Sequence, residues 1–72
     1  MAAQPIPSEI TGTIAQVLVQ VGDQVDEDTP LVMVESMKME IPVLAPRAGR
    51  VTEVCVAPGD AVGEGDRVAS IE

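Results

Sequence analysis

The sequence predicts an all-β fold, a flattened β-barrel or sandwich of two antiparallel four-stranded sheets with pseudo-twofold symmetry. Twelve valines and five isoleucines favour strands. Six prolines, spread from position 5 to position 58, leave no window for a long helix. The chain also contains an internal repeat, in which residues 12–35 match residues 49–72 at an offset of 37.

Runs of β-branched residues between turn signals are expected to form the strands. In chain order these runs are 13–21, 31–36, 39–44, 50–57 and 67–71, and a short extended segment is expected at 6–10. Turns are expected at Gly22-Asp23, at Gly59-Asp60 and over 63–66, because glycine and aspartate tolerate the backbone angles that tight turns require.

The repeat predicts how the two halves pack. Eight of its 24 aligned positions are identical, whereas ordinary residue frequencies would give about two. Two β units of this size are expected to cover each other's apolar sides. The expected core is the set of apolar pairs that both halves share: Ile14/Val51, Val17/Val54, Val19/Val56, Val25/Val62, Leu31/Val68 and Val34/Ile71, with Ile6/Val43 upstream.

The same pairs predict a β-bulge in each half. The step from Ile14 to Val17 breaks the alternation of apolar residues, and the step from Val51 to Val54 breaks it identically. Because Val54 and Val56 are assigned to the core, alternation places Cys55 on the opposite face, where we expect partial exposure and an inert thiol.

Composition excludes several classes of function. The 72 residues predict a single domain over 1–72, with little room for a deep pocket. A net charge of −8 and the absence of aromatic residues argue against binding to nucleic acid or to an anionic membrane surface. The chain has no histidine and one cysteine, so we expect no metal site and no intramolecular disulfide. No secretion signal or membrane span is apparent, and a cytoplasmic location is expected.

One segment is not explained by the repeat. Residues 36–48 join the two units, and this joint begins at the sequence Glu35-Ser36-Met37-Lys38-Met39-Glu40. Lys38 is the only lysine in the chain and lies between two expected strands, so it is expected on a hairpin turn. A lysine held there is a nucleophile presented away from the body of the fold, and the flanking methionines are apolar and adaptable, suited to contact with another protein.

The hexapeptide and the repeated Gly-Asp-x-Val turns resemble the biotinyl/lipoyl attachment domain family, of the biotin carboxyl carrier type. The likeness runs from about Ile6 to the last residue. The resemblance implies that biotin is attached by an amide to Lys38. It also implies that Met37, Met39, Glu35, Ser36 and Glu40 form the motif recognised around the attachment site. Methionine on both sides of the lysine is the biotin form of the motif, whereas lipoyl domains usually place Asp before the lysine and Ala after it.

The resemblance implies partners rather than catalysis. A biotin protein ligase would attach the biotin, a biotin carboxylase would carboxylate it, and a carboxyltransferase would pass the CO₂ to an acyl-CoA or a 2-oxo acid. The chain would then be no enzyme but a carrier in a biotin-dependent carboxylase such as acetyl-CoA carboxylase, and a monomer when isolated. Two alternatives stay open: a lipoyl carrier domain, and an unmodified lipoyl-like interaction module.

The sequence departs from the family pattern in a few places. Asp28 stands where the family commonly has glycine, although aspartate tolerates the left-handed conformation. The stretch 22–31 has no insertion, so the protruding "thumb" of some acetyl-CoA carboxylase carriers is expected to be absent. No linker or dimerising segment is seen before Ile6, so a free-standing domain is expected. The repeat offset also places the two ends of the chain near each other and opposite Lys38.

Overall fold

A computed structural model describes residues 3–72 of the chain, and eight strands make up its secondary structure. They are β1 (Gln4–Pro7), β2 (Gly12–Val17), β3 (Gln24–Val25), β4 (Pro30–Ser36), β5 (Met39–Leu44), β6 (Gly49–Val54), β7 (Ala61–Val62) and β8 (Arg67–Ile71). Since the described part of the chain contains no helix, it also contains none that could cross a membrane.

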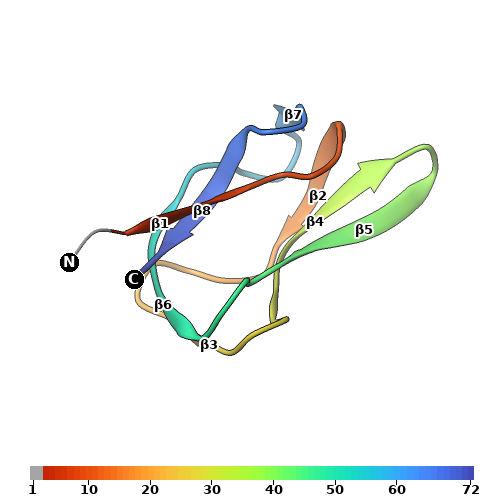
Figure 1. Cartoon of the computed structure of the whole chain (residues 1–72). Helices are drawn as coiled ribbons and strands as arrows, with labels where there is room; N and C mark the ends of the chain where they lie inside the picture. Colours follow the sequence, from red (N-terminus) through yellow and green to blue (C-terminus); the bar gives the residue numbers. More distant parts are fainter. Residues whose placement is uncertain (1–2) are drawn as a thin grey trace.

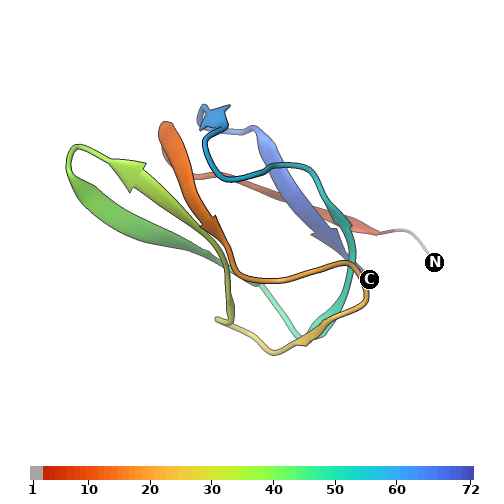
Figure 2. The same ribbon diagram turned by 180° about the vertical axis from the view of Figure 1, so that it is seen from behind.

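The strands form two four-stranded sheets that face each other, which confirms the predicted all-β architecture (Figures 1 and 2). One sheet has the order β1-β8-β6-β3 and the other β5-β4-β2-β7, and every pairing is antiparallel. Adding the repeat offset of 37 converts β4 into β8 and β2 into β6, and subtracting it converts β5 into β1 and β7 into β3, so the two sheets have equivalent strand orders. The molecule is elongated, 36 Å by 17 Å by 17 Å.

The predicted glycine-aspartate turn of each half of the chain forms a hydrogen bond to a strand of the other half. The N–H of Gly22 donates to the carbonyl of Val51 at 2.8 Å, and the N–H of Gly59 donates to the carbonyl of Ile14 at 2.8 Å. Both glycines have a positive φ, near 98° and 96°, which glycine adopts without a steric penalty. The two halves are therefore interlocked by equivalent hydrogen bonds.

Most of the predicted core lies inside. Nine of the predicted core side chains are at most 5% exposed: Ile6, Ile14, Val25, Leu31, Val34, Val51, Val62, Val68 and Ile71. Val17, Val54 and Val56 are only partly buried and pack against the edge of the core. Val32, Ala45 and Ala69 are buried although the repeat did not single them out. The core therefore follows the repeat at its centre and departs from it at the ends of the strands.

Both predicted bulges are present. The register of β2 against β4 shifts between Ile14 and Gln16, and that of β6 against β8 shifts between Val51 and Glu53.

Asp28, the departure from the family pattern, has φ 70°, close to the φ of 90° at its repeat partner Gly65. Aspartate therefore takes the left-handed conformation here, as the sequence predicted.

The predicted strands 13–21 and 50–57 are too long. The structure ends them at Val17 and Val54, because the chain then crosses to the opposite sheet, where β3 pairs with β6 and β7 with β2. These two-residue strands follow turns and were not predicted. The expected segment 6–10 is shifted, since β1 ends at Pro7.

The ends of the described chain lie at the pole opposite the β4–β5 turn, as the offset predicted (Figure 1). Gln4 of β1 pairs with Ile71 of β8. The β4–β5 hairpin extends away from this pole. Residues 39–43 match residues 2–6 at the repeat offset, and residue 2 of that match lies outside the described residues.

Candidate functional site

Lys38 lies at the tip of the β4–β5 hairpin, in a turn of two residues. Ser36 of β4 pairs with Met39 of β5, which leaves Met37 and Lys38 as the only residues of the turn. Their φ angles are 52° and 66°. Positive φ at both central residues is the signature of a type I′ turn, which matches the twist of the flanking strands and normally contains asparagine and glycine.

The turn residues are therefore strained. A left-handed conformation costs a residue that has a side chain roughly 1 kcal/mol. Neither methionine nor lysine has the short polar side chain that offsets this cost in asparagine or aspartate. The pairing of β4 with β5 holds the turn in place, because five consecutive pairs of residues are in register, from Ser36 with Met39 to Val32 with Val43. Backbone strain of this kind is concentrated at functional sites.

The hairpin tip is fully presented to solvent. Lys38 is exposed, and the neighbouring methionines are 92% (Met37) and 63% (Met39) exposed. Among residues 3–72, no side chain forms a hydrogen bond or ion pair with Lys38. Two largely exposed methionines side by side at one tip suit a surface that another protein covers.

The structure brings all six residues of the predicted motif together at this tip. Glu35 and Glu40 lie directly opposite each other across β4 and β5, and both are exposed. Like charges in this position destabilise a strand pair modestly. The tip thus consists of one primary amine, two exposed thioethers and two carboxylates, and it offers a nucleophile without a base or a pocket of its own.

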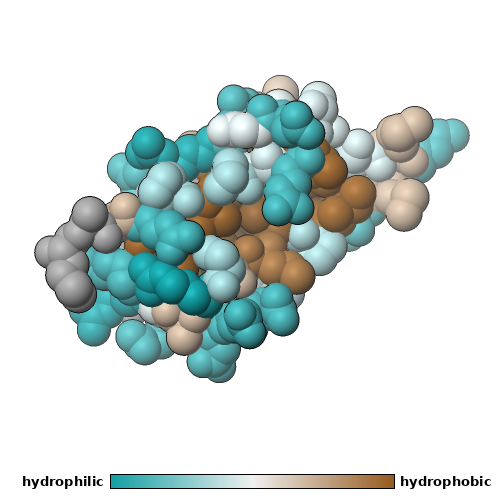
Figure 3. All heavy atoms as spheres, viewed as in Figure 1, coloured by the Kyte–Doolittle hydropathy of each residue, from teal (hydrophilic) through white to brown (hydrophobic). Residues whose placement is uncertain are grey.

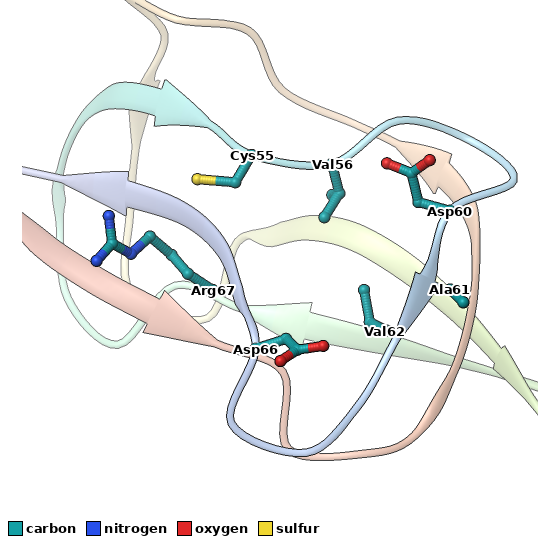
Figure 4. Close-up of a pocket in the computed structure, with 7 residues that line it drawn as sticks. All are labelled: Cys55, Val56, Asp60, Ala61, Val62, Asp66 and Arg67. Carbon is teal, nitrogen blue, oxygen red and sulfur yellow. The ribbon is translucent and has the colours of Figure 1, made fainter.

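A separate pocket of about 420 Å³ lies beside Cys55 (Figure 4). Its two aspartates stabilise turns: Asp60 accepts a hydrogen bond from the N–H of Ala57 at 2.9 Å, and Asp66 accepts one from the N–H of Gly63 at 2.8 Å. Cys55 is exposed, as predicted, and its thiol lies 3.4 Å from Glu53 Oε1. The acids of this pocket are thus structural, and no catalytic constellation is formed there.

The pKa of the Cys55 thiol is raised. Desolvation is the largest cause, and Glu53 adds to it through a hydrogen bond and through its charge, while Arg67 opposes it. Less thiolate is then present at neutral pH, in agreement with the predicted inert thiol. Within residues 3–72 there is no cluster of three side chains suited to hold a metal ion.

Comparison with known proteins gives a consistent result. A family model described as "Biotin-requiring enzyme" matches residues 2–71. The chain is 46% identical over 69 residues to the "Biotinylated protein TB7.3 homolog" of Mycobacterium leprae, which covers 96% of this chain and 97% of that protein. It is 44% identical over 70 residues to the "Biotin carboxyl carrier protein" of Streptococcus mutans, which covers 97% of this chain and 54% of that protein.

Solved structures of large carboxylases contain the same fold. The urea carboxylase of Kluyveromyces lactis matches all of this chain with a TM-score of 0.93 and 35% identity, over 6% of the enzyme's length. A single-chain, multi-domain long-chain acyl-CoA carboxylase matches 94% of this chain with a TM-score of 0.89 and 32% identity, over 7% of its length. The chain therefore spans about half of the streptococcal carrier and a small part of each carboxylase.

Proposed function

Because this chain belongs to the biotin/lipoyl attachment family and is a carrier of covalently attached biotin, we propose that Lys38 is the residue that carries it. The observation that supports this assignment is the position of the only lysine in the chain at the tip of an exposed, strained hairpin. The residues present fit the group, since an amide needs a free primary amine and no neighbouring side chain covers this one.

Attachment requires an activated acyl donor. Nζ of Lys38 attacks the acyl carbon of biotinyl-adenylate, loses a proton, and forms an amide while AMP leaves. Among residues 3–72 no carboxylate contacts Nζ, so the proton acceptor belongs to the biotin protein ligase that holds the adenylate. The chain contributes the nucleophile and its presentation. The ligase contributes the acid-base chemistry.

In this proposal the ligase recognises a surface around Lys38 that is formed by Met37, Met39, Glu35, Ser36 and Glu40. The methionines supply apolar contact area, and the paired carboxylates attract a basic surface on the partner. After attachment, the ureido ring of biotin supplies the nitrogen that accepts and releases a carboxyl group.

The carrier serves a biotin carboxylase and a carboxyltransferase of one biotin-dependent enzyme, for which an acyl-CoA carboxylase such as acetyl-CoA carboxylase is the proposed parent. In the two-sheet body, the ends of the described chain lie at the pole opposite the β4–β5 turn. A neighbouring domain or subunit can therefore attach there without covering the hairpin. A cytoplasmic location is proposed because both the ligation and the carboxylation consume ATP.

We expect the isolated domain, residues 1–72, to be a monomer. Pro5 and Pro7 lie on the edge strand β1, and Pro42 lies on the edge strand β5. Proline has no N–H to donate, so these edges are poor templates for pairing with a second chain.

The experiment that tests the proposal is enzymatic modification of the whole chain. The protein is incubated with a biotin protein ligase, biotin and ATP, and its intact mass is measured. The proposal predicts a mass increase of one biotin, and no increase in the Lys38→Arg variant. A mass increase of one lipoyl group by a lipoyl ligase, with no reaction by the biotin ligase, would support the lipoyl alternative instead.

A further inference from the structure

An apolar groove of about 310 Å³ lies between the edge strands β1 and β5, and we call it the β1–β5 groove. Its walls come from both strands and from the segments that follow them: Gln4, Pro5, Ile6, Pro7, Glu9, Ile10, Ile41, Pro42, Val43, Leu44 and Pro46. Figure 3 shows hydrophobic side chains gathered on the face where these two strands lie in front, toward the side of the hairpin. Neither the repeat nor the attachment motif accounts for an open apolar groove.

The backbone of the groove is symmetric, but its two ends are not. The repeat offset of 37 pairs Gln4 with Ile41 and Ile10 with Arg47. At the end nearest the termini, Nε of Arg47 donates a hydrogen bond to Oε1 of Gln4 at 2.8 Å. The equivalent positions at the other end are two partly buried isoleucines, which line the groove. The lining residue Gln4 is thus held by Arg47 at one end of the groove, whereas Ile10 and Ile41 line the other end together with Glu9.

The apolar end is within reach of the side chain of Lys38. Ile41 lies in β5, three residues after the turn residue Lys38, so their Cα atoms are at most about 10 Å apart. A lysine side chain with the acyl chain of biotin adds on the order of ten bonds of about 1.5 Å each between Cα and the ring. The arm is thus long enough to return along β5 and place its head group between Ile41 and Ile10.

The edge strands also restrict what can bind in the groove. Pro5, Pro7 and Pro42 remove N–H donors from both edges, so an added β-strand would find few backbone partners. The groove instead offers isoleucine, proline and leucine side chains with one carboxylate, Glu9. A compact ring with an apolar side and N–H donors on its other edge matches this composition.

We propose that the β1–β5 groove binds the fused-ring head of the biotin attached to Lys38, and so gives the arm a resting position on its own carrier. This inference rests on the proposed attachment at Lys38. Ile10 and Ile41 contact the apolar side of the ring, and Glu9 accepts a hydrogen bond from its ureido N–H. The ring then leaves the groove only when a partner enzyme binds it more tightly.

The test compares biotinylated and unmodified full-length chain by NMR with ¹³C-labelled methyl groups. Intact mass is measured first. We expect nuclear Overhauser effects between the ring protons and the methyl groups of Ile10 and Ile41, and shifted methyl signals at these residues. The methyl groups of Leu18, which is 47% exposed and outside the groove, are the internal control and should not change.

Two outcomes would overturn the inference. A modified chain that shows no ring contacts to the groove, with shifts confined to residues 37–39, would contradict the resting position alone. An unmodified mass after treatment with the ligase would contradict the attachment at Lys38 as well. The intact mass therefore separates a failure of the attachment from a failure of the resting position alone.

The repeat itself supplies the variants. The double variant Ile10→Arg/Ile41→Gln copies the polar pair of the opposite end to the lysine side, where the symmetric backbone already accommodates it. The single variant Ile41→Gln serves if the double variant fails to fold. In either variant, the chemical shifts of the ring protons should return to those of free biotinyl-lysine. In the control Gln4→Ala, which removes the hydrogen bond at the far end, they should stay as in the unaltered carrier. Bound-state shifts that persist in the isoleucine variants would overturn the inference.

Discussion

Met37 and Lys38 share a left-handed backbone at the β4–β5 turn, with φ angles of 52° and 66°. Of the residues between 3 and 72, only Asp28 is a further non-glycine with positive φ. Asp28 lies in a turn where the repeat partner is a glycine, so its conformation follows from the fold. The turn at Met37 and Lys38 has no glycine as a repeat partner, and its left-handed backbone costs each of these residues roughly 1 kcal/mol.

Replacement of this turn by its favoured residues should therefore stabilise the fold and abolish its function. The variant Met37→Asn/Lys38→Gly is expected to raise the free energy of unfolding by about 1 kcal/mol, because asparagine and glycine adopt type I′ angles with less strain. Urea unfolding measures the change. A lower stability than that of the unaltered chain would show that the turn is not strained.

Lys38→Arg separates the chemical role of the lysine from any structural role. Its side chain is exposed and forms no hydrogen bond or ion pair with the described residues, so the free energy of unfolding should change by less than about 0.5 kcal/mol. Labelling by the ligase should be lost completely, since the guanidinium is not an acylation target in this reaction. Remaining streptavidin signal in this variant would mean that biotin is attached elsewhere.

Gly12 is required by a close approach of two strands. A Cβ atom at this position would overlap the carbonyl oxygen of Glu35 and lie 2.9 Å from Cγ1 of Val34, so Gly12→Ala should cost about 1–3 kcal/mol. Gly63→Ala is the matched control, because the nearest atom to a Cβ there is Oδ2 of Asp66 at 3.6 Å. Equal midpoints of thermal unfolding for the two variants would contradict the close approach.

The thiol of Cys55 should react slowly with iodoacetamide. Desolvation, together with the hydrogen bond and charge of Glu53, raises its pKa, so the thiolate fraction at a given pH is smaller than for a free cysteine. Glu53→Gln removes the charge, lowers the thiol pKa, and should move the pH profile of alkylation to lower pH. Arg67→Gln should move it the other way, because Arg67 lowers the pKa. A profile unaffected by Glu53→Gln would exclude this electrostatic coupling.

Much of the fold could be predicted because the chain contains two copies of one pattern. The break in alternation at Ile14–Val17 and Val51–Val54 located both bulges, and the shared apolar pairs located the centre of the core. Strand ends were less predictable. Val19 and Val56 continue an apolar pattern, yet the chain has already left the strand to reach the opposite sheet, a tertiary effect that residue type does not encode.

The candidate site, like the fold, could be predicted from the sequence only in part. A lone lysine between methionines identified the hairpin, and the offset placed it opposite the termini. The β1–β5 groove was not predicted, although the sequence contains a signal for it: Ile41 and Ile10 are two of the positions where an apolar residue of one half matches a polar residue of the other, here Gln4 and Arg47. Such a difference becomes meaningful only when the two edge strands are known to lie side by side.

A tryptic peptide map of the biotinylated chain tests the attachment at Lys38 most directly. Trypsin cleaves after lysine and arginine but not after an acylated lysine, and Lys38 is the only lysine in the sequence. Modification at Lys38 predicts that the peptides 1–38 and 39–47 disappear together and that a single biotin-bearing peptide 1–47 takes their place. Biotin found in a digest where cleavage after Lys38 is complete would contradict the assignment.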